Sequence, residues 1–174
     1  MALREILTEP NKILRQKSLP VDSVDKETQI LMDDMLDTMY AAPGIGLAAI
    51  QVGVPKRIIV LDIEQKEGKK KPLFFVNPEI IEKSKNLSTY EEGCLSVPGQ
   101  FAEIDRPDEC HIKYLDYHGN KKEIKAVGML ATCIQHEMDH LEGILFIDYL
   151  SKLKKTMIIK KLSKQKKELE RIVV

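Results

Sequence analysis

The fold of this chain is decided by residues 128–143, which read GMLATCIQHEMDHLEG. The stretch has the length and composition of a helix, and Gly143 is typical of a C-terminal cap. At about 100° per residue, one arc of this helix collects five side chains, namely Met129, Thr132, Cys133, His136 and His140. We expect this arc to face the interior of the protein.

The same helix carries an H-E-x-x-H pattern over residues 136–140. Two imidazoles one turn apart can hold a single metal ion, and Glu137 lies about 60° to 100° around the helix, where it reaches a water on the metal without being a ligand. The pattern also occurs on solvated helix faces. Here His136 and His140 share their arc with apolar residues. A buried histidine side chain needs a hydrogen-bond or metal partner, because burying an unpaired polar group costs free energy. The pattern therefore predicts a metal site.

A catalytic metal site usually has three protein ligands and one open position, so a third ligand is expected elsewhere in the chain. The side chains of suitable chemistry are Cys94, Cys110, Cys133, His111, His118, Asp139 and Glu142. We select Cys94, because it lies in EEGCLSVP at residues 91–98, where Gly93 lets the backbone bend. The other two cysteines are interpreted as buried small hydrophobes. The other two histidines are placed on a strand and in a turn, without a catalytic role.

The rest of the chain predicts short strands and two further helices. Asp25 is a good N-cap for a helix that ends near Tyr40. Residues 44–51, GIGLAAIQ, predict a loop, because neither a helix nor a strand favours their glycines. Runs of branched and aromatic residues predict strands at 57–62, 73–76, 110–117 and 121–126. The last two flank His118-Gly119-Asn120, a hairpin signal. The predicted fold class is α+β, with antiparallel β-sheets around a central metal-binding helix and with N-terminal and C-terminal helices.

Charge divides the chain into two parts. Residues 151–174 carry nine basic and two acidic side chains and predict a basic amphipathic helix, whose apolar positions are Leu153, Met157, Leu162, Leu169 and Ile172. The whole chain has 174 residues, of which 43% are apolar, and is long enough for one core. We predict a single catalytic domain over residues 1–150 and a basic helix over 151–174 that packs on it or extends from it.

Nothing in the sequence predicts export or membrane insertion. The first 19 residues carry six charged side chains, which leaves no room for the apolar core of a secretory signal. The longest uncharged run, residues 38–55, contains two prolines and three glycines and is a poor bilayer span. Three cysteines cannot all pair within one chain. We therefore expect a cytoplasmic protein that does not enter a membrane.

Three segments together resemble the signature motifs of peptide deformylases, in that family's order. They are GIGLAAIQ at 44–51, EGCLS at 92–96 and QHEMDH at 135–140. The resemblance continues through VNPE at 76–79, Arg106 and residues 143–148, and it covers most of residues 3–155. Ile50 departs from the family, which usually has proline there, and this concerns only the stiffness of the loop.

The resemblance implies an enzyme that removes the formyl group from the N-terminal formyl-methionine of newly synthesised polypeptides and releases formate. It implies a metal held by Cys94, His136 and His140, with Fe(II) as the native ion and nickel or cobalt in prepared forms. The ligand chemistry alone would suit Zn(II) at least as well, so iron rests on the resemblance.

The resemblance also implies roles for individual residues. Hydroxide on the metal would attack the formyl carbon, with Glu137 accepting the proton and later returning it to the leaving amine. The side chain of Gln51 and the backbone N–H of Leu95 would stabilise the developing oxyanion. The residues expected to bind the substrate backbone or its methionine side chain are Ile45, Gly46, Gly93, Met129, Thr132 and Cys133.

Two other functions remain open from the residues alone. A metallopeptidase also uses H-E-x-x-H, but its third ligand is normally a downstream His or Glu rather than an upstream cysteine. A ribosome-binding or RNA-binding module with a structural metal would need four closed ligands. The expected partners are nascent formyl-methionyl polypeptides and, through the basic helix, the ribosome, because lysines attract phosphates. We expect a monomer.

Overall fold

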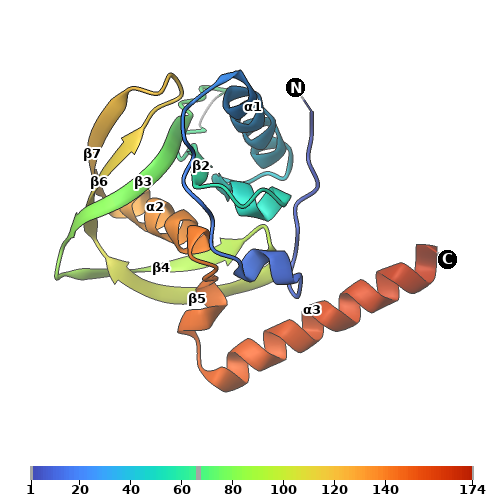
Figure 1. Cartoon of the computed structure of the whole chain (residues 1–174). Coiled ribbons are helices and arrows are strands. Elements are labelled where there is room, and N and C mark those ends of the chain that lie inside the picture. The colour runs from blue at the N-terminus through green and yellow to red at the C-terminus, as the bar shows by residue number, and fades with distance from the viewer. Residues whose placement is uncertain (1, 66–67, 174) are drawn as a thin grey trace.

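The computed structural model describes residues 2–65 and 68–173. Three α-helices and seven strands are joined by short 3-10 turns (Figure 1). The helices are α1 (Lys26–Ala41), α2 (Gly128–Leu141) and α3 (Lys152–Val173). The strands are β1 (Gly46–Ala48), β2 (Ile58–Leu61), β3 (Leu73–Lys83), β4 (Leu87–Cys94), β5 (Val97–Pro107), β6 (Glu109–Leu115) and β7 (Lys121–Val127). The 3-10 turns are η1 (Lys12–Arg15), η2 (Ala49–Val52) and η3 (Phe146–Tyr149).

Two antiparallel sheets surround helix α2. The larger sheet has the order β1-β2-β3-β6-β7, and β4 pairs with β5 in a separate two-stranded sheet. Helix α2 packs against strands of both sheets (Figure 1). This arrangement confirms the α+β fold class with antiparallel sheets around the helix that carries residues 136–140.

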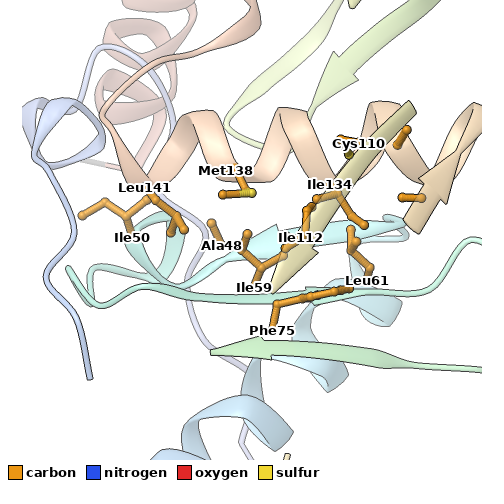
Figure 2. Packing of buried hydrophobic residues seen from close by; sticks show 12 residues of the cluster. Ala48, Ile50, Ile59, Leu61, Phe75, Cys110, Ile112, Ile134, Met138 and Leu141 are labelled. Atoms are coloured by element: carbon orange, nitrogen blue, oxygen red, sulfur yellow. The ribbon is translucent and has the colours of Figure 1, made fainter. Parts of the chain in front are cut away.

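The main core lies between α2 and the larger sheet. Ile134 and Leu141 of α2 are almost fully buried and face the aliphatic side chains of β1, β2 and β6 (Figure 2). Full burial of an aliphatic side chain stabilises the fold by about 1.5 to 3 kcal/mol. The packing therefore sets which face of α2 points inward. Of the arc predicted to face the interior, Thr132, His136 and His140 are buried and Cys133 is half-buried, but Met129 in the first turn is exposed.

The predicted helix boundaries agree closely with the structure. Asp25 caps α1, because its carboxylate accepts a hydrogen bond from the backbone N–H of Thr28 at 2.8 Å. Helix α2 occupies residues 128–141, as predicted. Gly143 follows with φ of 75°, and a Cβ atom there would collide with the carbonyl oxygen of Arg15. Only glycine combines this backbone conformation with so close an approach.

Three stretches of the sheets differ from the sequence prediction. The strand predicted at 73–76 continues to Lys83 as β3, because β6 pairs with its second half. The predicted loop 44–51 contains strand β1 and turn η2, and Gly46 pairs with Leu61 of β2. Pairing with β2 thus stabilises an extended conformation that residues 46–48 do not favour by themselves. Strands β4 and β5 were not predicted at all, because most of their side chains are exposed or half-buried and give no clear apolar alternation.

Helix α3 lies along β5 and η3 and then continues beyond them (Figure 1). The predicted apolar face was largely wrong, since Leu153, Met157 and Leu169 are exposed and only Leu162 of that set is buried. The contact is made instead by Leu162 together with the half-buried Ile158 and Ile159. The side chain of Ile172 lies outside the described residues. No helix in the described residues is both long enough and apolar enough to cross a bilayer.

Candidate metal centre and active-site cavity

Cys94, His136 and His140 come together, as the sequence predicted. Their ligand atoms all lie within 4.8 Å of one another, and the Sγ atom of Cys94 is 3.3 Å from Nε2 of His140. Donor atoms placed about 2.0 to 2.3 Å from a tetrahedral ion stand roughly 3.3 to 3.8 Å apart. One thiolate and two imidazoles at this spacing fit a divalent transition metal. Within the described residues this group contains three donors, so a fourth position can remain open for substrate.

Cys94 reaches the helix because of a local irregularity in its sheet. Strand β4 ends at Cys94, and the pairing with β5 shifts register between Gly93 and Cys94. The chain then turns over Leu95 and Ser96 into β5. Gly93 packs so tightly under the ring of Phe101 that a Cβ atom would lie 2.6 Å from it. The irregularity predicted at Gly93 is present as this register shift, and the close contact with Phe101 leaves no room for a side chain at that position.

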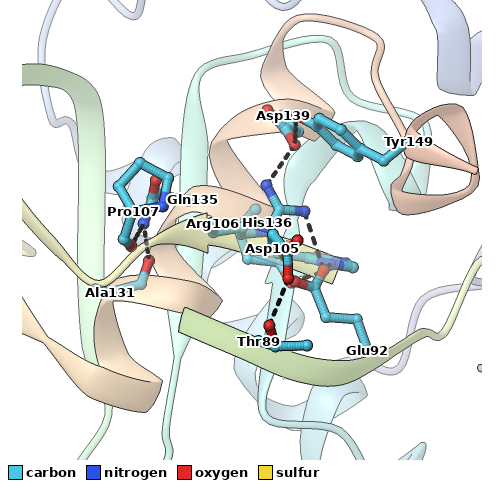
Figure 3. A network of polar contacts seen from close by, with 11 residues as sticks. Thr89, Glu92, Asp105, Arg106, Pro107, Ala131, Gln135, His136, Asp139 and Tyr149 are labelled. Carbon is cyan, nitrogen blue, oxygen red and sulfur yellow. Dashed lines mark hydrogen bonds and ion pairs between the residues drawn. The ribbon is translucent and has the colours of Figure 1, made fainter. Parts of the chain in front are cut away.

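A buried charged chain orients His136 from behind (Figure 3). Nδ1 of His136 lies 2.8 Å from Oε1 of Glu92, and the guanidinium of Arg106 binds both oxygens of Glu92 at 2.7 and 3.0 Å. Arg106 also donates to Asp139 at 2.8 Å, and the hydroxyl of Tyr149 donates to the same carboxylate at 2.7 Å. An ionised carboxylate can only accept, so His136 carries its proton on Nδ1 and presents Nε2 to the metal position.

The charges at this centre follow from burial and pairing. Burial alone would raise the pKa of Glu92, but hydrogen bonds from His136 and Arg106 outweigh it and lower the pKa below the usual value. Burial and the neighbouring His136 lower the pKa of His140 well below its usual value, so its ring keeps a free lone pair. Burial raises the pKa of Cys133 to about 12, which makes this thiol a neutral wall of the cavity rather than a nucleophile.

Glu137 lies beside the metal position without joining the three ligands. Its Oε1 atom is 4.0 Å from Nε2 of His136, and its side chain is only 7% exposed. Within the described residues, the buried Oε2 atom has no hydrogen-bond partner. Burial raises the pKa of Glu137 to about 7. A carboxyl group with this pKa can both accept and release a proton near neutral pH.

Gln51 is held rigidly against the end of β4. Its side-chain oxygen accepts from the backbone N–H of Ala48 at 2.9 Å, while its Nε2 donates to Ser96 at 3.0 Å and approaches Sγ of Cys94 at 3.5 Å. The N-terminal segment also supports this region, because the N–H of Leu7 donates to the carbonyl of Gln51 at 2.7 Å. The amide donor therefore faces the metal centre with little freedom to turn.

One cavity of about 630 Å³ opens onto this centre. It is lined by every residue that the sequence predicted for substrate binding and catalysis, namely Ile45, Gly46, Gln51, Gly93, Leu95, Met129, Thr132, Cys133 and Glu137. Ile6, Phe101 and Pro98 also line it and were not predicted. Their positions depend on how the N-terminal segment and β5 fold over the cavity.

The supporting chain behind His136 was missed as a functional unit. Asp139 was weighed as a ligand, but its carboxylate binds Arg106 and Tyr149 instead. Once β5 is known as a strand, its alternation places Arg106 on the same buried face as Ile104, but that strand has no clear signal in the sequence. His111 pairs with the exposed Glu123 at 3.1 Å and belongs to the hairpin rather than the site, as predicted.

Comparisons with known proteins agree with this geometry. A family model described as polypeptide deformylase matches residues 3–156. The peptide deformylase of Pelagibacter ubique (strain HTCC1062) is 70% identical over 174 residues, with all of both chains covered. That of Maricaulis maris (strain MCS10) is 60% identical, with 98% of each chain covered. A crystal structure of peptide deformylase from Ehrlichia chaffeensis is 44% identical and superposes with a TM-score of 0.91 over 96% of this chain and 98% of that one. This chain belongs to the polypeptide deformylase family.

Proposed function

We propose that the cavity beside Cys94, His136 and His140 binds the formylated amino terminus of a polypeptide and that Glu137 moves the protons of the reaction. The chain is a metal-dependent hydrolase that removes the N-formyl group from nascent polypeptides. The C–N bond of the formyl amide breaks, and the products are formate and a free amino terminus. The observation that carries the residue assignment is the convergence of the three ligand atoms within 4.8 Å beside a buried carboxyl group.

A divalent ion held by these three side chains would supply a Lewis acid that acidifies water and polarises a carbonyl group. We propose Fe(II) as the working ion, on the family resemblance. Nickel, cobalt or zinc would fit the same sulfur and nitrogen donors. The protein's own contribution is to hold one thiolate and two neutral imidazoles in place, with His136 oriented by Glu92.

Glu137 acts first as a base and then as an acid. Its carboxylate takes a proton from the attacking water and later returns that proton to the amine nitrogen, so the amide breaks without expelling an amide anion. Gln51 and the backbone N–H of Leu95 donate hydrogen bonds to the oxygen that becomes negative. Both groups line the same cavity as Glu137. Because Ala48 and Ser96 hold the amide of Gln51 in place, the N–H that approaches Sγ of Cys94 at 3.5 Å needs only a small shift to donate to that oxygen.

The substrate backbone extends the larger sheet at β1. This strand is at the edge of the sheet order, so one side of Gly46 is free of strand pairing in the described residues. An extended peptide can add to such an edge through main-chain hydrogen bonds. Ile45 and Gly46 would bind it from one side and Gly93 from the other. Met129, Thr132 and Cys133 would then surround the methionine side chain.

Formate release from short peptides tests the assignment. Formyl-Met-Ala peptides should release formate, and the acetylated and unformylated versions should not react, because the cavity would admit a single hydrogen on the carbonyl carbon. Internal peptide bonds should remain intact, which separates this activity from that of a metallopeptidase. Cleavage of internal bonds, or equal turnover of the acetylated peptide, would contradict the proposal.

The identity of the metal has its own test. An iron-loaded preparation should lose activity in air faster than a nickel-loaded one, because a thiolate-ligated ferrous site is oxidisable. Replacing Cys94 with serine should reduce metal content or change metal preference. Equal lifetimes would count against iron, and unchanged metal content in the Cys94→Ser variant would point to a different ligand.

We also propose that α3 brings the enzyme, as a monomer in the cytoplasm, to ribosomes on which formylated chains emerge. The supporting observation is the row of exposed basic residues beyond the packed part of the helix, namely Lys164, Lys166, Lys167 and Arg171. Co-sedimentation with ribosomes should weaken as salt rises and should fall when these four residues are replaced by glutamate. Salt-independent binding, or none, would refute this contact.

A further inference from the structure

A second cavity, of about 910 Å³, lies between β5 and α3. It shares Gln100 and Phe101 of β5 with the active-site cavity, so these two residues border both hollows. Figure 1 shows the first turns of α3 below β5, with the rest of the helix running away from the sheet toward the C-terminus. We call this second hollow the β5–α3 groove.

The walls of the β5–α3 groove combine apolar and basic side chains. Phe101 and Met157 are exposed by 65% and 61%, and Leu150 and Ile158 form the half-buried floor. Its lysines are Lys154, Lys160 and Lys161, and its single acidic residue is Glu103. Within the described residues, none of the three lysines makes an ion pair, whereas Lys155 binds Asp148 at 2.7 Å. The groove therefore presents uncompensated positive charge next to apolar surface.

We propose that the β5–α3 groove binds the part of the nascent polypeptide that follows its first three residues, and that it favours acidic and apolar side chains there. This inference rests on the proposed function, because the occupant is the continuation of the chain whose amino terminus lies in the active-site cavity. This occupant is favoured because Gln100 and Phe101 line both the β5–α3 groove and the active-site cavity.

The reach of an extended peptide is consistent with this placement. Phe101 pairs directly with Gly93, one residue before Cys94, so its backbone lies about 5 Å, one strand spacing, from β4. Each substrate residue advances an extended chain by about 3.3 Å, and a helix packs about 10 Å from a neighbouring layer. A peptide that starts at the metal centre and turns past Phe101, which lines both cavities, covers that distance with two or three residues. It reaches the lysines of α3 at roughly its fourth to seventh residue.

Formylated octapeptides provide the test. Two peptides would share formyl-Met-Ala-Ser at the start and carry either four acidic or four lysine residues at positions four to seven. With the unaltered enzyme at low ionic strength, kcat/KM should be about three- to tenfold higher for the acidic peptide. A formyl-Met-Ala-Ser tripeptide reports the chemistry without using the groove.

Charge-reversal variants locate the effect. The double variant Lys154→Glu, Lys161→Glu should reverse the preference between the two octapeptides and leave the tripeptide rate unchanged. The matched control Lys166→Glu, Lys167→Glu makes the same charge change on the same helix, beyond the groove, and should keep the original preference. Both pairs are exposed, so neither substitution disturbs a buried contact.

Each outcome decides the proposal. Equal rates for the two octapeptides, or an equal loss of preference in the control variant, would overturn it. Loss of ribosome co-sedimentation in the Lys154→Glu, Lys161→Glu variant without any change in peptide preference would assign these lysines to RNA instead and would also overturn it. If the tripeptide releases no formate, the proposed function is wrong. Equal rates for the two octapeptides, with normal turnover of the tripeptide, would refute only the role of the β5–α3 groove.

Discussion

Glu92 and His136 are joined across the gap between the two-stranded sheet and helix α2, with Oε1 of Glu92 2.8 Å from Nδ1 of His136. This contact is buried, since the two side chains are only 6% and 9% exposed. Because Glu92 belongs to β4, this hydrogen bond fixes the orientation of the metal-binding ring of His136 relative to that strand. The metal centre is therefore assembled from the two-stranded sheet and helix α2, and neither β4 nor α2 could form it alone.

Replacing Glu92 with glutamine should loosen the metal centre. The change removes the charge that holds the guanidinium of Arg106 and fixes the Nδ1 proton of His136, and loss of such an orienting carboxylate typically costs 10- to 100-fold in metal affinity. Metal release to a chelator, followed by absorbance, measures the effect. The neighbouring Glu91→Gln, at an exposed position, is the control. Equal metal release from the two variants would refute the orienting role.

Replacing Glu137 with glutamine should lower kcat for formate release by about 10²- to 10⁴-fold while metal content stays unchanged, because only the proton acceptor is lost. Glu142→Gln, at the end of the same helix, is the control, since its carboxylate pairs with Arg57 and Lys17 outside the cavity. Substantial turnover by a fully metal-loaded Glu137 variant would assign proton transfer to another group.

Replacing Gln51 with leucine should lower kcat by about 100-fold or more and leave metal content unchanged, because one oxyanion donor is removed. Ser96→Ala keeps that donor and removes only the hydroxyl it binds, so kcat should fall by less than about tenfold. Steady-state kinetics on a formylated tripeptide compares the two. A larger loss for Ser96→Ala would mean that Gln51 acts mainly by holding the turn after β4.

Replacing Gly46 with alanine should damage activity more than stability. The added Cβ atom would lie 2.7 Å from Oε1 of Glu137 and 2.7 Å from Cδ2 of Leu61, so the catalytic carboxyl group must move. Gly119→Ala is the comparison, because it sits at φ of 83° in the β6–β7 turn and should lose about 1 to 2 kcal/mol of stability without loss of kcat. Urea unfolding measures stability and formate release measures kcat, and the two variants should differ in which of these quantities falls. Full activity of Gly46→Ala would contradict the close contact between this position and Glu137.

Asp148 should make the stability of the protein depend on acidic pH. Burial alone would raise its pKa, but bonds from Lys155, the N–H of Leu145 and Arg15 lower it below the usual value of about 3.9. A carboxyl group with a lowered pKa stabilises the fold above that value, and the contribution is lost as the pH falls through the folded-state pKa.

Urea unfolding of the Asp148→Asn variant tests the expected direction of this change of stability with pH. The variant should be less stable than the unaltered protein by about 1 to 2 kcal/mol at pH 7, and the difference should disappear near pH 2. Glu9, which also binds Arg15, has a pKa raised mainly by burial, so its contribution to the pH dependence of stability has the opposite sign. For this reason only Asp148 is replaced in the test. The exposed Asp22→Asn is the control. A difference that does not change with pH would refute the assignment.

The local features of the site could be predicted from short stretches of the chain. Helical periodicity acts over three or four residues, so the boundaries of α2 and the shared arc of His136 and His140 could be predicted from residues 128–143 alone. The cap at Asp25 and the hairpin around Gly119 are equally local. For the same reason Glu137 could be placed beside the metal position before any contact was known.

Which distant residues support the metal centre depends on how the sheets and helices pack together. Arg106 reaches Glu92 through the register of β4 against β5, and Asp139 is turned toward Arg106 rather than the metal. The apolar face of α3 was misjudged because periodicity fits several faces of a helix, and only the position of η3 selects Ile158 in place of Leu153. Such contacts depend on long-range strand pairing and layer packing, which no short window of sequence contains.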